Sequence, residues 1–158
     1  MPVWAQSEQD SVQRSAAKNC QVWPEILRNM PVSKGRFVTV AGVETLVMFR
    51  LANTNERLAQ GFQFTCIETI NSTNILFDFS RLVIPSFHMN NVVSPLDIAF
   101  IDDSGQIVNI YLMKTYRLLD LKKPTYRPSK PVLYAFEAKA GFFTKHGIKV
   151  GDKFFIQQ

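Results

Sequence analysis

The chain has 158 residues, of which 46% are hydrophobic and 20% are charged, and its net charge is +5. This length fits one domain, and the hydrophobic share is too high for an intrinsically disordered protein. No run approaches the roughly 20 consecutive apolar residues of a membrane-spanning helix, so we expect no membrane partner. The first residues lack the basic start and apolar run of a signal peptide, so the chain is either intracellular in origin or already processed. We expect an intracellular or virion-associated protein.

Residues 1–34 differ in residue pattern from the rest of the chain and are predicted to form an irregular N-terminal arm. A helix over residues 7–20 would be weak, because its apolar face is thin. The large apolar side chains of the arm are candidate anchors for a protein partner or a homo-oligomer, and these are Trp4, Trp23, Leu27 and Met30. For the two tryptophans, the favoured interpretation is that they cover an open end of the chain's own core.

From residue 35 to residue 158, alternating apolar and polar residues predict a single β domain. Strands or short extended pieces are expected over residues 36–41, 44–52, 62–70, 74–79, 87–91, 97–102, 106–113, 132–138 and 153–156. A short helix is predicted between its N-cap, Thr54, and its C-terminal stop, Gly61, and a turn or second helix over residues 141–145. The predicted fold class is mainly β: a small antiparallel barrel-like or two-layer sheet domain with one or two short helices.

The two cysteines, Cys20 and Cys66, lie in different regions and show no Cys-x-x-Cys or Cys/His spacing. We expect two free, mostly buried thiols, because cysteine is among the residues most often found in protein interiors. The alternative is a disulfide that ties the arm to the body, which needs an oxidising compartment.

Positive charge is concentrated between residues 114 and 153, where ten Lys and Arg residues face three acidic ones. Three prolines within residues 116–131 predict an irregular, exposed loop. The predicted basic face comprises Lys114, Arg117, Lys122, Lys123, Arg127 and Lys130. Such a face could follow a phosphate backbone, but no nucleic-acid fold signature accompanies it, and a solvated face or an acidic protein neighbour is favoured.

Residues 74–102 gather polar, sulfur and aromatic side chains between apolar strands. The candidate ligand pocket consists of His88, Met89, Asn90, Asn91 and Asp97. A His beside an Asp could orient a general base, but Asp97 could instead bond the backbone of the preceding proline turn. No nucleophile with its base, no metal-ligand spacing and no nucleotide motif is found, so we predict no catalytic residues, metal or cofactor.

The same stretch and its flanks resemble the family called domain of unknown function 192, over roughly residues 43–155. The ordered segments that carry the resemblance are NILFDF (74–79), FHMNN (87–91), PLDIAFID (95–102), AFEAKAG (135–141) and GIKVGD (147–152). The family usually has Trp, Lys and Thr where this chain has His88, Asn90 and Val92, and Gly-Met where it has Asn74 and Ile75. The resemblance therefore implies that the chain has the family's fold, with different residues at the rim of the pocket.

These observations predict a non-catalytic structural, assembly or protein-docking module. The resemblance implies a concrete version, a component of a phage particle, because some relatives are encoded by phages. The first alternative is a small-ligand-binding or enzymatic domain that uses His88, Asn90 and Asp97. The second alternative is nucleic-acid binding through the basic loop, residues 114–130.

Overall fold

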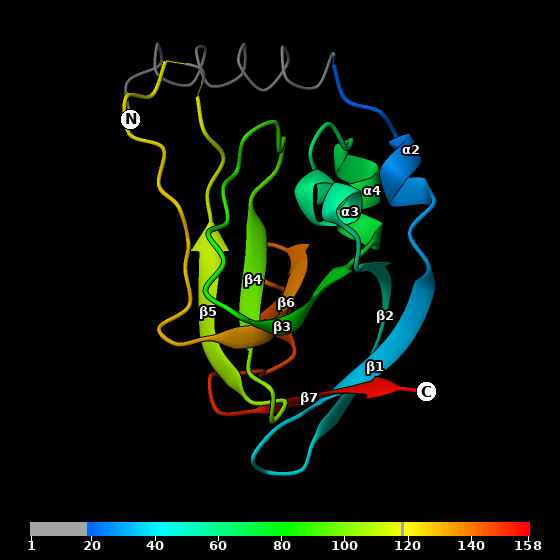
Figure 1. Ribbon diagram of the computed structural model, residues 1–158, viewed down its shortest axis with the longest axis vertical. Helices are drawn as coiled ribbons and strands as arrows, with labels where there is room; N and C mark the ends of the chain where they lie inside the picture. Colours follow the sequence, from blue (N-terminus) through cyan, green and yellow to red (C-terminus); the bar gives the residue numbers. More distant parts are fainter. Residues whose placement is uncertain (1–18, 118) are drawn as a thin grey trace.

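A computed structural model of the chain describes residues 19–117 and 119–158. They form a seven-stranded, mostly antiparallel sheet with the strand order β5-β4-β6-β3-β2-β1-β7 (Figure 1). The strands are β1 (Val32–Val38), β2 (Glu44–Ala52), β3 (Ile75–Val83), β4 (Leu96–Ile101), β5 (Ile107–Met113), β6 (Val132–Lys139) and β7 (Lys153–Gln157). The helices of the described residues are α2 (Glu25–Arg28), α3 (Asn55–Gln60), α4 (Ile67–Ser72) and α5 (Phe142–Lys145). The mainly β fold is confirmed, with four short helices in this part of the chain instead of the expected one or two.

The strand pairing explains where the helices lie. β1 and β2 form the expected antiparallel hairpin, and β7 pairs with the other side of β1. β2 and β3 are parallel, so the chain crosses between them through α3 and α4 (Figure 1). The remaining neighbours pair antiparallel, which leaves β6 between β3 and β4 in the middle of the sheet.

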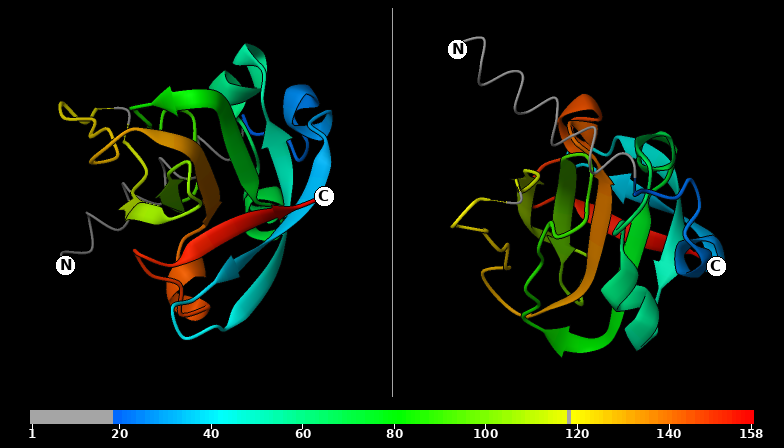
Figure 2. Two further views of the ribbon diagram at one scale, coloured as in Figure 1. Left: turned by 60° about the horizontal axis from the view of Figure 1, so that its bottom comes forward. Right: turned by 90° about the horizontal axis from the view of Figure 1, so that it is seen from above.

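The sheet is open, with β5 and β7 as its edge strands, but it curls until these edges meet at one end (Figure 2). An isolated bridge joins Gln106 to Lys153. Beside it, the Ile107 amide donates to the Asp152 carbonyl at 2.9 Å, and the Phe154 amide donates to the Gly105 carbonyl at 2.8 Å. The sheet is thus strongly curled, and a different core cluster packs on each of its two faces.

Alternate residues of the central strands belong to two separate core clusters. Inside the curl, the Phe136 ring packs among other phenylalanine rings, whose centroids lie 5.0 to 6.3 Å from its own. These rings are those of Phe37, Phe49, Phe142, Phe143 and Phe154. The neighbouring Ala135 belongs to the other cluster, which also contains Leu27, Met30 and Met89. We call the sheet face of this second cluster the pocket face.

The predicted strand over residues 62–70 is wrong, because its second half belongs to α4. Thr69 and Ile70 are buried while Ile67 and Glu68 are exposed. This one-sided burial is satisfied by a helical turn, in which the Ile70 amide donates to the Cys66 carbonyl at 3.2 Å. The extended piece expected over residues 87–91 is reduced to one bridge between Phe87 and Tyr126.

The expectation of two free thiols is also wrong, because Cys20 and Cys66 form a disulfide. The chain beside it is held by a parallel bridge between Gln21 and Thr65, and the Cys66 amide donates to the Gln21 carbonyl at 2.9 Å. The part of the arm from residue 19 onwards is therefore tied to the body. Trp4 and most of the helix expected over residues 7–20 lie outside the described residues.

The helix α3 begins and ends as predicted. The Thr54 hydroxyl accepts a hydrogen bond from the Arg57 amide at 3.4 Å, and Gly61 follows with a φ of 47°. Within the described residues, no helix combines the length and apolar character needed to cross a membrane.

Replacing Thr54 with Ala should lower the free energy of unfolding by about 1 kcal/mol, because one amide at the start of α3 loses its acceptor. Urea denaturation measures the change. Thr54→Ser keeps a hydroxyl and should recover most of the lost stability, whereas equal losses for Ala and Ser would contradict a capping role.

Candidate ligand-binding pocket

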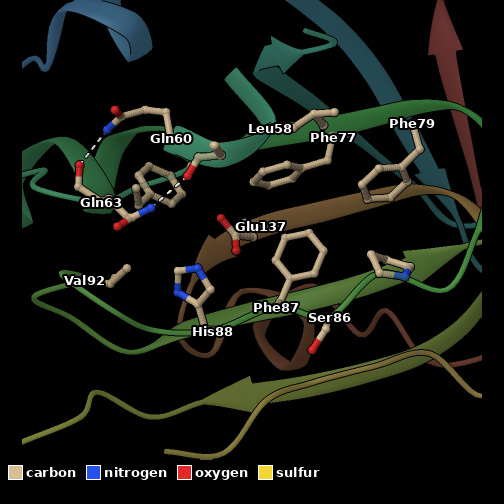
Figure 3. A pocket seen from close by; sticks show the side chains of 14 residues that line it. Leu58, Gln60, Gln63, Phe77, Phe79, Ser86, Phe87, His88, Val92 and Glu137 are labelled. Atoms are coloured by element: carbon tan, nitrogen blue, oxygen red, sulfur yellow. Dashed lines mark hydrogen bonds between the residues drawn. The ribbon is translucent and has the colours of Figure 1, made fainter. Parts of the chain in front are cut away.

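A cavity of about 340 Å³ lies on the pocket face, between the α3 region and the loop that joins β3 to β4 (Figure 3). We call residues 84–95 the pocket loop. The apolar part of the lining includes Leu58, Phe62, Phe77, Phe79, Phe87 and Val92. The polar side chains of the lining are those of Gln60, Gln63, Ser86, His88 and Glu137. A cavity of this size and mixed character fits a small organic ligand.

Local structure explains how these side chains come together. The positive φ of Gly61 (47°, with a ψ of −132°) ends α3 and turns the chain so that Phe62 enters the core. A Cβ added at Gly61 would lie 3.5 Å from the Phe77 ring and 3.7 Å from Oε2 of Glu137. The end of α3 therefore lies directly over the strands that carry these two residues.

Glu137 is the buried acid of the pocket. It lies on β6, opposite Ile75 of β3 and Ile98 of β4, and only 4% of its surface is exposed. Its carboxyl points into the cavity near Phe77, Phe87 and His88 (Figure 3). Within the described part of the chain it has no hydrogen bond or ion pair. Burial raises the pKa of Glu137 to about 8, so its carboxyl is mostly protonated at pH 7.

The polar groups of the rim are largely engaged with one another. Gln60 Nε2 donates to the Gln63 carbonyl at 2.6 Å, and Gln63 Nε2 donates to the Ala59 carbonyl at 2.8 Å. His88 Nδ1 accepts from the Asn90 amide at 3.2 Å, which leaves its Nε2 available. The rim is thus fixed by local hydrogen bonds, and none of them reaches Glu137.

The structure separates the residues that the sequence grouped as a ligand pocket. His88 lines the cavity, but Met89 is buried in the core, and Asn91 Nδ2 donates from outside the lining to Gln63 Oε1 at 3.1 Å. Asn90 contributes its backbone amide to His88 and is not part of the lining.

Asp97 lies on the opposite face of the sheet from the pocket, so its place in the candidate ligand pocket beside His88 is wrong. Leu96 and Ile98 belong to the cluster of the pocket face, and side chains alternate along β4. The Asp97 carboxylate instead accepts hydrogen bonds at the start of α5, including one from the Phe143 amide at 3.4 Å. Burial raises the pKa of Asp97, and the backbone hydrogen bonds oppose this shift. Its role at α5 also replaces the expected role at the proline turn.

The interface anchors expected in the arm have different surroundings. Leu27 and Met30 are almost fully buried in the chain's own core, so as placed they cannot contact a partner. Trp23 is 37% exposed, and the Arg50 guanidinium lies 5.0 Å from its ring centroid. An assembly or docking role therefore stays a prediction, and Trp23 is the described anchor that supports it.

The six residues of the predicted basic face are exposed on an irregular loop, as expected. Two of them are neutralised locally, because Lys130 pairs with Asp102 at 2.8 Å and Arg117 pairs with Asp120 at 3.2 Å. Tyr126, on the same loop, packs against the core. Nucleic-acid binding stays a prediction.

The described residues contain no group of three or more His, Cys, Asp or Glu that could hold a metal ion.

Fold and pocket together define a small, mainly β domain with a ligand-sized cavity on one face of a curled sheet. The chain belongs to the domain of unknown function 192 (DUF192) family, described as an uncharacterized ACR, whose model matches residues 37–156. The resemblance stated from the sequence is thereby confirmed. Comparison with curated proteins finds no match.

The solved structures that share this fold include two from different organisms. One, from Novosphingobium aromaticivorans DSM 12444, is a protein of unknown function that is 22% identical, with a TM-score of 0.72 over 89% of this chain and 96% of that chain. The other, from Sinorhizobium meliloti 1021, is described as a "putative transcription regulator" and is 24% identical, with a TM-score of 0.69 over 80% of this chain and 95% of that chain. At these identities the likeness extends to the fold alone.

Proposed function

We propose that this domain binds a small organic ligand in the pocket between α3 and the pocket loop and does not catalyse a reaction on it. The observation that carries the proposal is the unpartnered, almost fully buried carboxyl of Glu137 inside a cavity of about 340 Å³. Since no described residue offers this carboxyl a hydrogen bond, the cavity that it faces is where a partner for it would lie.

Binding is favoured over catalysis by the arrangement of the polar side chains. The titratable side chains of the lining are those of Glu137 and His88, and they make no hydrogen bond or ion pair with each other. Ser86 is exposed at the rim, and its hydroxyl makes no hydrogen bond to His88. The pair of activated nucleophile and base that covalent catalysis needs is therefore not assembled among the described residues of the pocket.

The test is a fragment screen by two-dimensional NMR on the wild-type domain and two tryptophan variants. Ala59→Trp places a large ring at an exposed position of α3 that lines the cavity, whereas Glu56→Trp changes an exposed position of the same helix outside the lining. Fragments that bind the pocket should shift the resonances of residues 58–63 and 85–92. Ala59→Trp should raise the dissociation constants of these fragments at least about tenfold, which corresponds to about 1.4 kcal/mol of binding free energy.

Glu56→Trp should bind these fragments as the wild type does. The proposal would be refuted by a screen without pocket shifts, or by fragments that keep their affinity in Ala59→Trp.

We also propose that the protein works in an oxidising compartment. The support is the Cys20–Cys66 disulfide, because such bonds are rare in reducing cytosol. This proposal replaces the intracellular part of the localisation expected from the sequence. Thiol labelling of the protein taken directly from its source measures whether Cys20 and Cys66 are oxidised. Two cysteines that resist labelling agree with the proposal, and two labelled thiols contradict it.

A further inference from the structure

We propose that the ligand is a small organic ammonium ion, an amine protonated at neutral pH that carries an apolar alkyl or aryl group. The charged nitrogen would bind Glu137 at the depth of the pocket, and the apolar group would pack against the surrounding phenylalanines. This inference rests on the proposed function and narrows it to one chemical class.

The first step concerns what Glu137 lacks. An ionised carboxylate accepts hydrogen bonds only, and no described residue donates one to it. Its neighbours across the sheet are Ile75 and Ile98, and Gly61 above it has no side chain. The complementary donor is therefore missing from the wall of the pocket and has to enter with the ligand.

The rim does not supply this donor either. The side-chain amides of Gln60 and Gln63 already donate to backbone carbonyls. No hydrogen bond or ion pair joins His88 to Glu137. A ligand that brings its own N–H groups thus meets a carboxyl that no described residue engages.

The rings around Glu137 favour a cation over a neutral donor. Phe77 and Phe87 stand perpendicular, with centroids 5.0 Å apart, and Phe79 lies 6.4 Å from Phe87. Phenylalanine faces attract positive charge, and this attraction grows when the cation is removed from water. An anion would instead meet the negative faces of these rings, and a purely apolar ligand would leave the carboxyl of Glu137 unpaired.

Charge balance completes the argument. Burial keeps a proton on the Glu137 carboxyl at neutral pH. An incoming ammonium stabilises the carboxylate, so that proton leaves to solvent and a charge-assisted ion pair forms in its place. Binding should therefore release protons at pH 7.

The test uses three probes of similar shape: 2-phenylethylamine, 2-phenylethanol and 3-phenylpropionate. Isothermal titration calorimetry and NMR titration should show the amine binding the wild type at least about tenfold more tightly than the alcohol, and no binding of the carboxylate. Calorimetry in buffers of different ionisation enthalpy should report about 0.9 proton released per amine bound at pH 7.

The pH series on the wild type needs no mutation. The amine affinity should rise about 50-fold between pH 6 and pH 8 as Glu137 ionises, while the amine stays protonated. Repeating the series in His88→Gln removes the other titratable group of the lining, and the rise should persist. In Glu137→Gln, checked for folding by NMR, the difference between amine and alcohol should fall to within about twofold.

The inference is overturned if the alcohol binds as tightly as the amine, if no protons are released, or if none of the three probes binds. Fragments of another class that occupy the pocket would leave the proposed function standing and refute only the ammonium. A pocket that binds nothing in the fragment screen would refute both.

Discussion

Raising the pH from 5 to 9 should lower the free energy of unfolding by about 4 kcal/mol through Glu137 alone. Burial raises the pKa of this carboxyl from 4.5 to about 8, so the folded chain keeps a proton that the unfolded chain releases over this range. Since the folded state binds more protons, each rise in pH favours unfolding. The loss begins near pH 4.5 and is complete above pH 8.

Urea denaturation of the wild type and Glu137→Gln, across this pH range, measures the effect. The difference in unfolding free energy between the two proteins should shift by about 4 kcal/mol in favour of the variant. Taking the difference removes the contribution of Asp97, whose raised pKa acts in the same direction. Asp102 does not interfere, because its pKa is lowered to about 2 and its contribution is lost only in acid.

Glu56→Gln serves as the matched control, since it makes the same substitution at an exposed site on α3. Its pH profile should follow that of the wild type. If Glu137→Gln also follows the wild type, the carboxyl does not titrate as a buried group and the charge argument for the pocket fails with it.

Much of the fold could be predicted from local patterns. The alternation of residues 44–52 and the capping residues Thr54 and Gly61 are dictated by neighbouring residues, and both elements appear where the sequence places them. Segment 62–70 could not be read this way, because Phe62 is buried by the packing of the pocket while Thr69 and Ile70 need a helix to be buried together. Short apolar runs fit either element until their surroundings are known.

The pocket itself depends on contacts between segments far apart in the sequence. The sequence points to His88 because this residue stands in an unusual cluster, but it misplaces Asp97, since one step along β4 reverses the face of the sheet. Glu137 was missed as a site residue, although it is a lone acid inside the apolar run Val132–Lys139. That signal acquires meaning only when β6 is known to lie between two other strands.

Breaking the Cys20–Cys66 disulfide should destabilise the fold by about 4 kcal/mol. The bond joins residues 46 apart, and opening a loop of this length restores conformational entropy to the unfolded chain. The effect should also reach the pocket wall. Cys66 directly precedes α4, and the Phe64 amide beside it donates to the Asn91 carbonyl of the pocket loop at 2.8 Å.

Thermal and urea unfolding with and without reductant measures this loss, with the double variant Cys20→Ser/Cys66→Ser as the reference. Reductant should lower the stability of the wild type to that of the double variant and should leave the double variant unchanged. Amide hydrogen exchange of residues 62–66 should accelerate in the same samples, because the segment loses its tie to the chain before α2. Unchanged stability on full reduction, confirmed by mass, would mean that the hydrogen bonds around Gln21 hold this segment without the disulfide.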